Sequence, residues 1–231
     1  MTRGDRMAVL LAVMAWTVVG TTRGLAAAPA SLPATQGTIA LAPDFDPQQY
    51  TTKAKLTMQQ AVALALQRVP GRVAWAGLED YRHSLYFSVE VVEPARTVKM
   101  VTLDAGTGAV TAVETPEAKA EATVDVGDAP AAAESEKGGV PKESPELSMV
   151  KGTIKVPEGA KDTELAYLTT TPIEQAMRSI ARKYRGAFLA ISVYREKETV
   201  MFGLELVQPG NKHTYFYYDP GKGKILDTTK W

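Results

Sequence analysis

Hydrophobic residues recur with helical spacing in two short segments of the chain. The stripe spans 58–69 in the first segment, where Thr57 and Gln60 fit a capping box. It spans 173–184 in the second, where Thr171-Pro172 provides an N-cap and a first-turn proline. We therefore predict one amphipathic helix in each half of the chain.

Each predicted helix is followed by runs in which apolar and polar residues alternate, as they do in half-buried strands. The runs are 72–80, 84–93 and 97–104 in the first half, and 187–195, 199–208 and 212–219 in the second. Alternation places one set of apolar side chains on a shared face, namely Leu85, Phe87, Val89 and Val91, and their counterparts Val200, Phe202, Leu204 and Leu206. We predict an α+β fold in which each half packs one helix on this face of an antiparallel sheet.

The two halves resemble each other when the chain is shifted by 115 positions, which brings Gly37 onto Gly152. The residues that are identical at this shift are Gly37-Thr38-Ile39, Gln60-Ala61, Gly71, Phe87, Glu90, Val92, Pro94, Asp104, Gly106 and Gly108. They concentrate on turn and strand positions, which chance similarity would not do. We infer a duplicated module, with one copy at 37–114 and the other at 151–231.

The segment between the two copies has the composition of an unpacked chain. Residues 115–150 are rich in Ala, Glu, Pro, Gly and Lys and contain no aromatic residue. Such a segment buries too little apolar surface to offset the entropy lost on ordering. We predict a disordered linker there.

The N-terminus has the three-part layout of a secretory signal. Two arginines precede an apolar run at 7–20, and small residues follow. We predict a signal peptide over 1–30, with cleavage after Ala26 or Ala30, and a lead-in at 31–36. An uncleaved anchor is the alternative, although the apolar run is shorter than the roughly 20 residues of a spanning helix.

A glycine-bearing turn precedes the last short strand of each module. The turn residues are Asp104, Gly106 and Gly108 in the first module, and Asp219, Gly221 and Gly223 in the second. An aspartate that starts a turn bonds its own backbone, and glycine tolerates a positive φ, so a hairpin explains both turns. A phosphate-binding loop would lead into a helix, whereas both of these lead into a strand pattern. We predict a structural role for them.

Large side chains are predicted on the sheet face opposite the helices, and they are our candidate partner-binding residues. The set is Trp75, Tyr86, Met100, Phe188, Tyr194, Met201, His213, Tyr215 and Tyr217. So much aromatic and apolar surface favours burial against a partner. The alternatives are that the two modules pack sheet on sheet with each other, or that a homodimer forms.

Composition excludes several classes of site. The chain has 26 basic and 26 acidic side chains, which gives no support for nucleic-acid binding. It has no cysteine, so disulfides, thiolate nucleophiles and cysteine zinc sites are excluded. The two histidines, His83 and His213, occupy non-equivalent positions, and we expect no metal site, no cofactor and no catalytic residue.

The stretch 56–113 closely resembles a PepSY domain through its helix "QAVALAL", its central strand "YFSVEVV" and its closing turn "DAGTGAV". The stretch 171–227 is similar to a more divergent member, because its turn "DPGKG" lacks the usual threonine. The resemblance implies a small α+β module of the kind found in propeptides of secreted metallopeptidases and in extracytoplasmic proteins. Its implied roles are to inhibit or hold a peptidase, or to sense something outside the cell, without catalytic residues.

We therefore expect a secreted or periplasmic, non-enzymatic protein whose tandem modules bind or regulate another extracytoplasmic protein such as a peptidase. The alternative is a protein of the cell envelope that binds or senses a small ligand or a metal ion. In either case we expect no stable membrane span after the signal peptide is removed.

Overall fold

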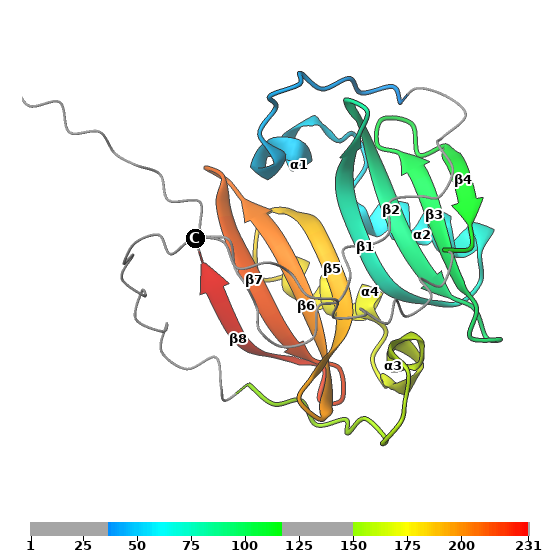
Figure 1. Cartoon of the computed structure of the whole chain (residues 1–231). Helices are drawn as coiled ribbons and strands as arrows, with labels where there is room; N and C mark the ends of the chain where they lie inside the picture. Colours follow the sequence, from blue (N-terminus) through cyan, green and yellow to red (C-terminus); the bar gives the residue numbers. More distant parts are fainter. Residues whose placement is uncertain (1–36, 117–149, 231) are drawn as a thin grey trace, which may run out of the picture.

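The computed structural model describes residues 37–116, here called the first half, and 150–230, the second half. Eight antiparallel strands in these residues form one sheet, ordered β4-β3-β2-β1-β5-β6-β7-β8 (Figure 1). The strands are β1 (Arg72–Tyr81), β2 (Ser84–Val92), β3 (Val98–Asp104), β4 (Val110–Glu114), β5 (Ala187–Glu196), β6 (Thr199–Gln208), β7 (Lys212–Asp219) and β8 (Lys224–Lys230). The predicted signal peptide, the lead-in and most of the predicted linker lie outside the described residues.

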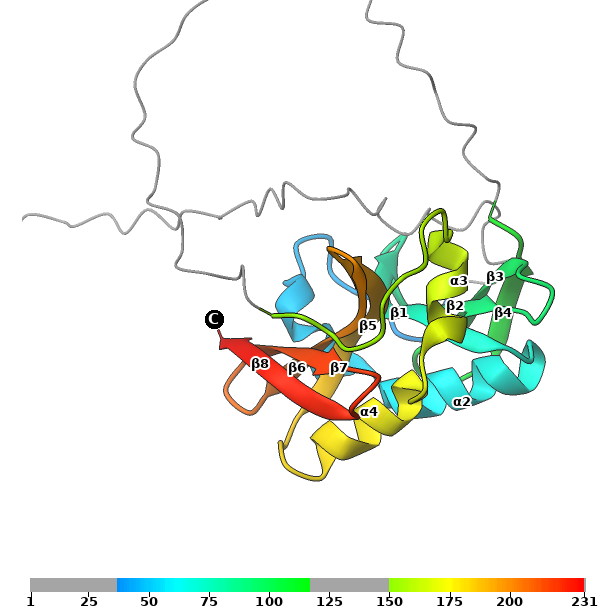
Figure 2. The same cartoon turned by 90° about the horizontal axis from the view of Figure 1, so that it is seen from below.

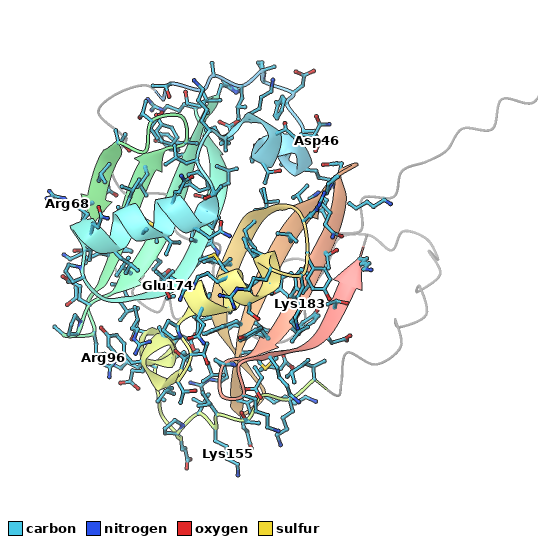
Figure 3. The ribbon with its side chains drawn as sticks, turned by 180° about the vertical axis from the view of Figure 1, so that it is seen from behind. Asp46, Arg68, Arg96, Lys155, Glu174 and Lys183 are labelled. Carbon is cyan, nitrogen blue, oxygen red and sulfur yellow. The ribbon has the colours of Figure 1, made fainter. Side chains whose placement is uncertain are left out.

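The two longer helices cover the same face of the sheet. Figure 2 shows α2 (Met58–Arg68) and α4 (Ile173–Ala181) side by side below the strands, and Figure 3 shows both in front of the sheet when it is seen from behind. The α+β prediction, with one helix of this kind in each half, is confirmed. We call the opposite side of the sheet the outer face.

The two helices begin differently. The predicted capping box of α2 is confirmed, since the Thr57 N–H donates to Gln60 Oε1 at 2.8 Å and the Gln60 N–H donates to Thr57 Oγ1 at 3.3 Å. The predicted cap of α4 is wrong, because its N-cap is Pro172 and no side chain caps it. Thr171 is engaged elsewhere, with its N–H donating to the carbonyl of Pro220 at 3.2 Å in the turn between β7 and β8.

The predicted inner face forms the hydrophobic core. Leu85, Phe87, Val89 and Val91 are at most 1% exposed and pack in one cluster with the apolar stripe of α2. Their counterparts on β6 are equally buried and join the same cluster with the stripe of α4. One core therefore runs through both halves, because α2 contacts β5 as well as its own strands β1 to β3.

The halves join edge to edge through β1 and β5. Only three residue pairs form this junction, Trp75 with Ser192, Ala76 with Ile191, and Gly77 with Ala190. The halves therefore do not pack sheet on sheet, which corrects that alternative. Ala76 and Ile191 differ by 115 positions, so the central pair consists of equivalent residues. In the flanking pairs, Trp75 contacts the equivalent of Gly77, and Gly77 contacts the equivalent of Trp75, as in an isologous contact.

Two short helices that the sequence analysis did not predict lie at opposite ends of the junction (Figure 1). Residues Pro47–Gln49 form a 3-10 turn, η1, that continues into α1 (Tyr50–Lys53), which contacts β5 and β1. The helix α3 (Asp162–Leu168) contacts β1, β5 and β2. A shift of 115 positions aligns η1 and α1 with α3, so each half has an equivalent short helix that contacts the other half.

Candidate binding surface and carboxylate turns

The carboxylate of Asp104 is the hub of the first glycine-bearing turn. It accepts the Thr38 N–H and hydroxyl at 2.6 Å each, the Thr107 N–H at 2.7 Å, the Thr107 hydroxyl at 2.8 Å and the Gly106 N–H at 3.1 Å. Burial alone would raise the pKa of Asp104, but the hydrogen bonds from Thr38 and Thr107 outweigh it and lower that pKa to about 2. The turn therefore holds the start of the first half against the end of β3.

The second turn repeats this contact 115 residues later. The Thr153 hydroxyl lies 2.9 Å from both carboxylate oxygens of Asp219, and the Gly221 N–H donates to Asp219 Oδ1 at 2.9 Å. Lys222 replaces the threonine that adds a hydroxyl donor in the first turn. In both turns the N–H groups point at the aspartate and the chain continues into a strand, which is the geometry of a structural hairpin.

The segments that lead into the two halves cover part of the outer face. The Leu85 N–H donates to the carbonyl of Ile39 at 3.0 Å, and the Val200 N–H donates to that of Ile154 at 2.9 Å. The Tyr86 hydroxyl beneath the first segment bonds the backbone of Gly37. Sequence reasoning found the repeated "GTI" of these segments but missed their role, because each threonine lies 66 positions from the aspartate that it bonds.

Strand register places most of the candidate partner-binding residues on the outer face, at different depths. Tyr86, Met100, Met201 and His213 are at most 3% exposed. Those that are partly exposed are Trp75, Tyr194, Tyr215 and Tyr217. We call these four the outer aromatic cluster. Their residues come from β1, β5 and β7, and so lie on both sides of the junction.

Phe188 differs from the expectation that it faces outward. It pairs with Leu206 on β6 and belongs to the hydrophobic core, where it is 3% exposed. A bulge between Phe188 and Ala190 explains the difference, because an extra residue reverses the alternation of side chains before it. A bulge between Val73 and Trp75 likewise turns Val73 into the core, while Trp75 faces outward as predicted.

The outer aromatic cluster packs on small residues of the sheet. Gly77 and Gly203 occupy neighbouring rows of the outer face, with Ser192 between Trp75 and Gly203. A Cβ on Gly77 would lie 2.6 Å from the Trp75 ring, and one on Gly203 would clash with the Tyr215 hydroxyl. The two glycines therefore let these aromatic side chains lie down on the sheet.

Two tyrosines of the cluster, Tyr194 and Tyr217, have a raised pKa. Tyr215 and Tyr217 are in edge contact, with ring centroids 5.0 Å apart. Burial, followed by the neighbouring Tyr215 and Tyr217, raises the pKa of Tyr194, and burial also raises that of Tyr217. The Tyr194 hydroxyl is buried without a hydrogen-bond partner among the described residues. A buried hydroxyl without a partner costs about 1–3 kcal/mol.

The two histidines lie in different surroundings. His213 is 2% exposed, and its Nδ1 lies 2.7 Å from Glu205 Oε1 on the neighbouring strand. His83 lies in the exposed turn between β1 and β2, with its Nδ1 3.9 Å from Asp80. Within residues 37–116 and 150–230, no group of three or more histidine or acidic side chains could hold a metal ion.

The family match concerns the first half, whereas a match to a solved structure spans most of the chain. Residues 55–114 match the PepSY family, described as peptidase propeptide and YPEB domain. No curated protein matches the chain. Among solved structures, a "putative lipoprotein" from Clostridium difficile 630 matches with 13% identity and a TM-score of 0.38, over 85% of this chain and 100% of that one.

The family match indicates an extracytoplasmic regulatory or binding protein without naming a partner. The match ends at residue 114, so the resemblance of the second half to this family stays a prediction. The described part of the chain contains no helix that is long and apolar enough to cross a membrane.

Proposed function

We propose that this protein is a non-enzymatic, extracytoplasmic binding protein that uses the outer aromatic cluster to hold or restrain another extracytoplasmic protein, such as a peptidase. The proposal includes secretion through the signal peptide at 1–30 and tandem PepSY-like modules at 37–114 and 151–231. A linker at 115–150 joins the two modules.

The observation that carries this proposal is the position of the cluster. Trp75, Tyr194, Tyr215 and Tyr217 are partly exposed on the face of the sheet that lies away from α2 and α4. Partly exposed aromatic side chains that are already fixed by their neighbours make effective anchors, since little rotamer entropy is lost when a partner covers them.

The match to a peptidase propeptide family supports a peptidase as the partner class. A propeptide restrains its enzyme by covering a surface rather than by performing chemistry. A broad, rigid sheet face suits that task, because its backbone needs no reordering on binding.

The test is the effect of the purified protein on the activity of secreted metallopeptidases, together with direct binding measurements. We expect binding at micromolar concentration or tighter, with a lowered rate of substrate cleavage. Trp75→Ala should weaken binding by about tenfold, the effect of losing one well-packed aromatic anchor. The matched control is Val113→Ser on β4, which removes an apolar group that is 38% exposed away from the cluster.

Two outcomes would contradict the proposal in different ways. Absence of both binding and rate change at micromolar protein would remove the peptidase-directed version. Equal binding by the Trp75→Ala and Val113→Ser variants would show that the partner contacts another surface.

A further inference from the structure

The junction of β1 and β5 relates the two halves by an approximate twofold axis, which allows its two ends to be compared. The axis passes beside the pair Ala76 and Ile191, which are equivalent residues. Helix α3 occupies one end, and η1 with α1 occupies the other. Two equivalent helices therefore contact equivalent parts of the sheet, but with different side chains.

At the α3 end, a tyrosine fills the contact between the halves. The Tyr167 hydroxyl donates to the carbonyl oxygen of Val92 at 3.0 Å. The guanidinium of Arg96 lies 3.8 Å from the centroid of the Tyr167 ring. Arg96 reaches this place from the loop between β2 and β3, where it has a φ of 65°. The ring is thus held at its hydroxyl and on its face.

At the α1 end, the equivalent positions leave a pocket of about 450 Å³. By the shift of 115 positions, Thr52 is equivalent to Tyr167, Val207 to Val92, and Asn211 to Arg96. All three line the pocket, and Asn211 has a φ of 57°, so the loop keeps the backbone conformation of its counterpart. The pocket exists because threonine replaces the ring.

We infer that this pocket receives a tyrosine side chain from a partner polypeptide. The ring would lie between Thr52 and the loop that contains Asn211, and its hydroxyl would donate to the carbonyl oxygen of Val207, as Tyr167 does to Val92. Segments 1–36 and 117–149 contain no tyrosine, so neither of them supplies the ring, and the occupant that we infer is a tyrosine of a partner. The inference deepens the proposed function, on which it rests for the existence of a polypeptide partner.

The first experiment uses the full-length processed protein and p-cresol, which is the side chain of tyrosine without its backbone. We expect saturable chemical-shift changes at the amides of Thr52, Gly210 and Asn211 in the millimolar range, and weaker changes with toluene, which lacks the hydroxyl. Thr52→Tyr should abolish the response because its own ring fills the pocket, whereas Thr52→Ser should keep it.

A reciprocal variant tests the role of the twofold relation. Tyr167→Thr should open an equivalent pocket at the α3 end, and p-cresol should then also perturb the amide of Arg96. If this variant binds p-cresol while the unchanged protein shows no saturable response at Asn211, the inference is overturned. The inference is also overturned if deletion of Trp231 shifts the amide signals of the pocket while p-cresol does not. Trp231 of this chain would then be the occupant.

A partner-binding measurement separates this inference from the proposed function. Thr52→Tyr should weaken binding of the partner protein at least tenfold, while Trp75→Ala tests the outer face. Loss of binding in the Trp75 variant, with full binding in the Thr52→Tyr variant, would overturn only the pocket. Full binding in both variants would contradict the pocket and the outer aromatic cluster together.

Discussion

At the scale of single residues, the turn at Asp104 could be predicted from the sequence, but its hydrogen-bond donor Thr38 could not. The Asx-type turn was predictable, because aspartate, threonine and glycine have local preferences. The bonds from Thr38 were not, because they join positions 66 apart and depend on how the sheet folds. Phe188 illustrates the same limit, since a single bulge residue reversed the face that alternation predicted.

The lowered pKa of Asp104 predicts a loss of stability in acid. The unfolded carboxyl titrates near its ordinary value of 3.8, and the folded one near 2. Its stabilising contribution, on the order of 2 kcal/mol, is therefore complete above about pH 4 and is lost as the pH falls toward 2. Denaturant unfolding of the unchanged protein and of Asp104→Asn at several pH values measures this.

The variant should be less stable by about 2 kcal/mol at neutral pH, and the difference should shrink in acid. The control is Asp44→Asn, which removes an exposed carboxylate and should change the stability by less than about 0.5 kcal/mol. A difference between Asp104→Asn and the unchanged protein that stays constant from pH 7 to pH 2 would contradict the assignment.

At the scale of elements, the two main helices were predictable and the short ones were not. The long apolar stripes indicate α2 and α4 directly, whereas α1 spans only Tyr50–Lys53 and has no periodic pattern to detect. The start of α4 was predicted incorrectly, since Pro172 is its N-cap and no side chain caps it, while the Thr171 N–H binds the turn between β7 and β8. Local sequence preference thus yields to a tertiary contact at this boundary.

The capping box of α2 leads to a prediction at this scale. Thr57→Ala should destabilise the protein by about 1 kcal/mol, because the N–H groups at the helix start lose the Thr57 hydroxyl. Thr57→Ser keeps the hydroxyl and should recover most of the loss. Thermal unfolding of the three proteins checks the order, and equal midpoints for the serine and alanine variants would show that the hydroxyl is not the cause.

At the scale of the whole molecule, one sheet and one core unite two halves that the sequence shows only as similar. The duplication indicated two modules, but nothing in a repeated sequence specifies whether the copies join by faces or by edges. The answer depends on β1, which is the edge strand of the first half taken alone and pairs with β5 over three residue pairs.

This edge predicts the behaviour of the first half alone. A chain of residues 37–116 would expose β1 and the side of α2 that contacts β5. We expect it to pair with a second copy of itself around Ala76, because the natural junction is already nearly isologous. Light scattering after gel filtration should show a dimer, and Ala76→Pro, which disrupts edge pairing, should give a monomer. A stable monomer without the proline would contradict this.

The twofold junction also bears on how such a protein can change. In a dimer of identical chains every substitution appears at both ends of the interface, so a contact cannot be given up at one end and kept at the other. A duplicated chain is free of that restriction, and the contrast between Tyr167 and Thr52 is a case in point. One end fastens the halves together, and the other is released to serve a different molecule.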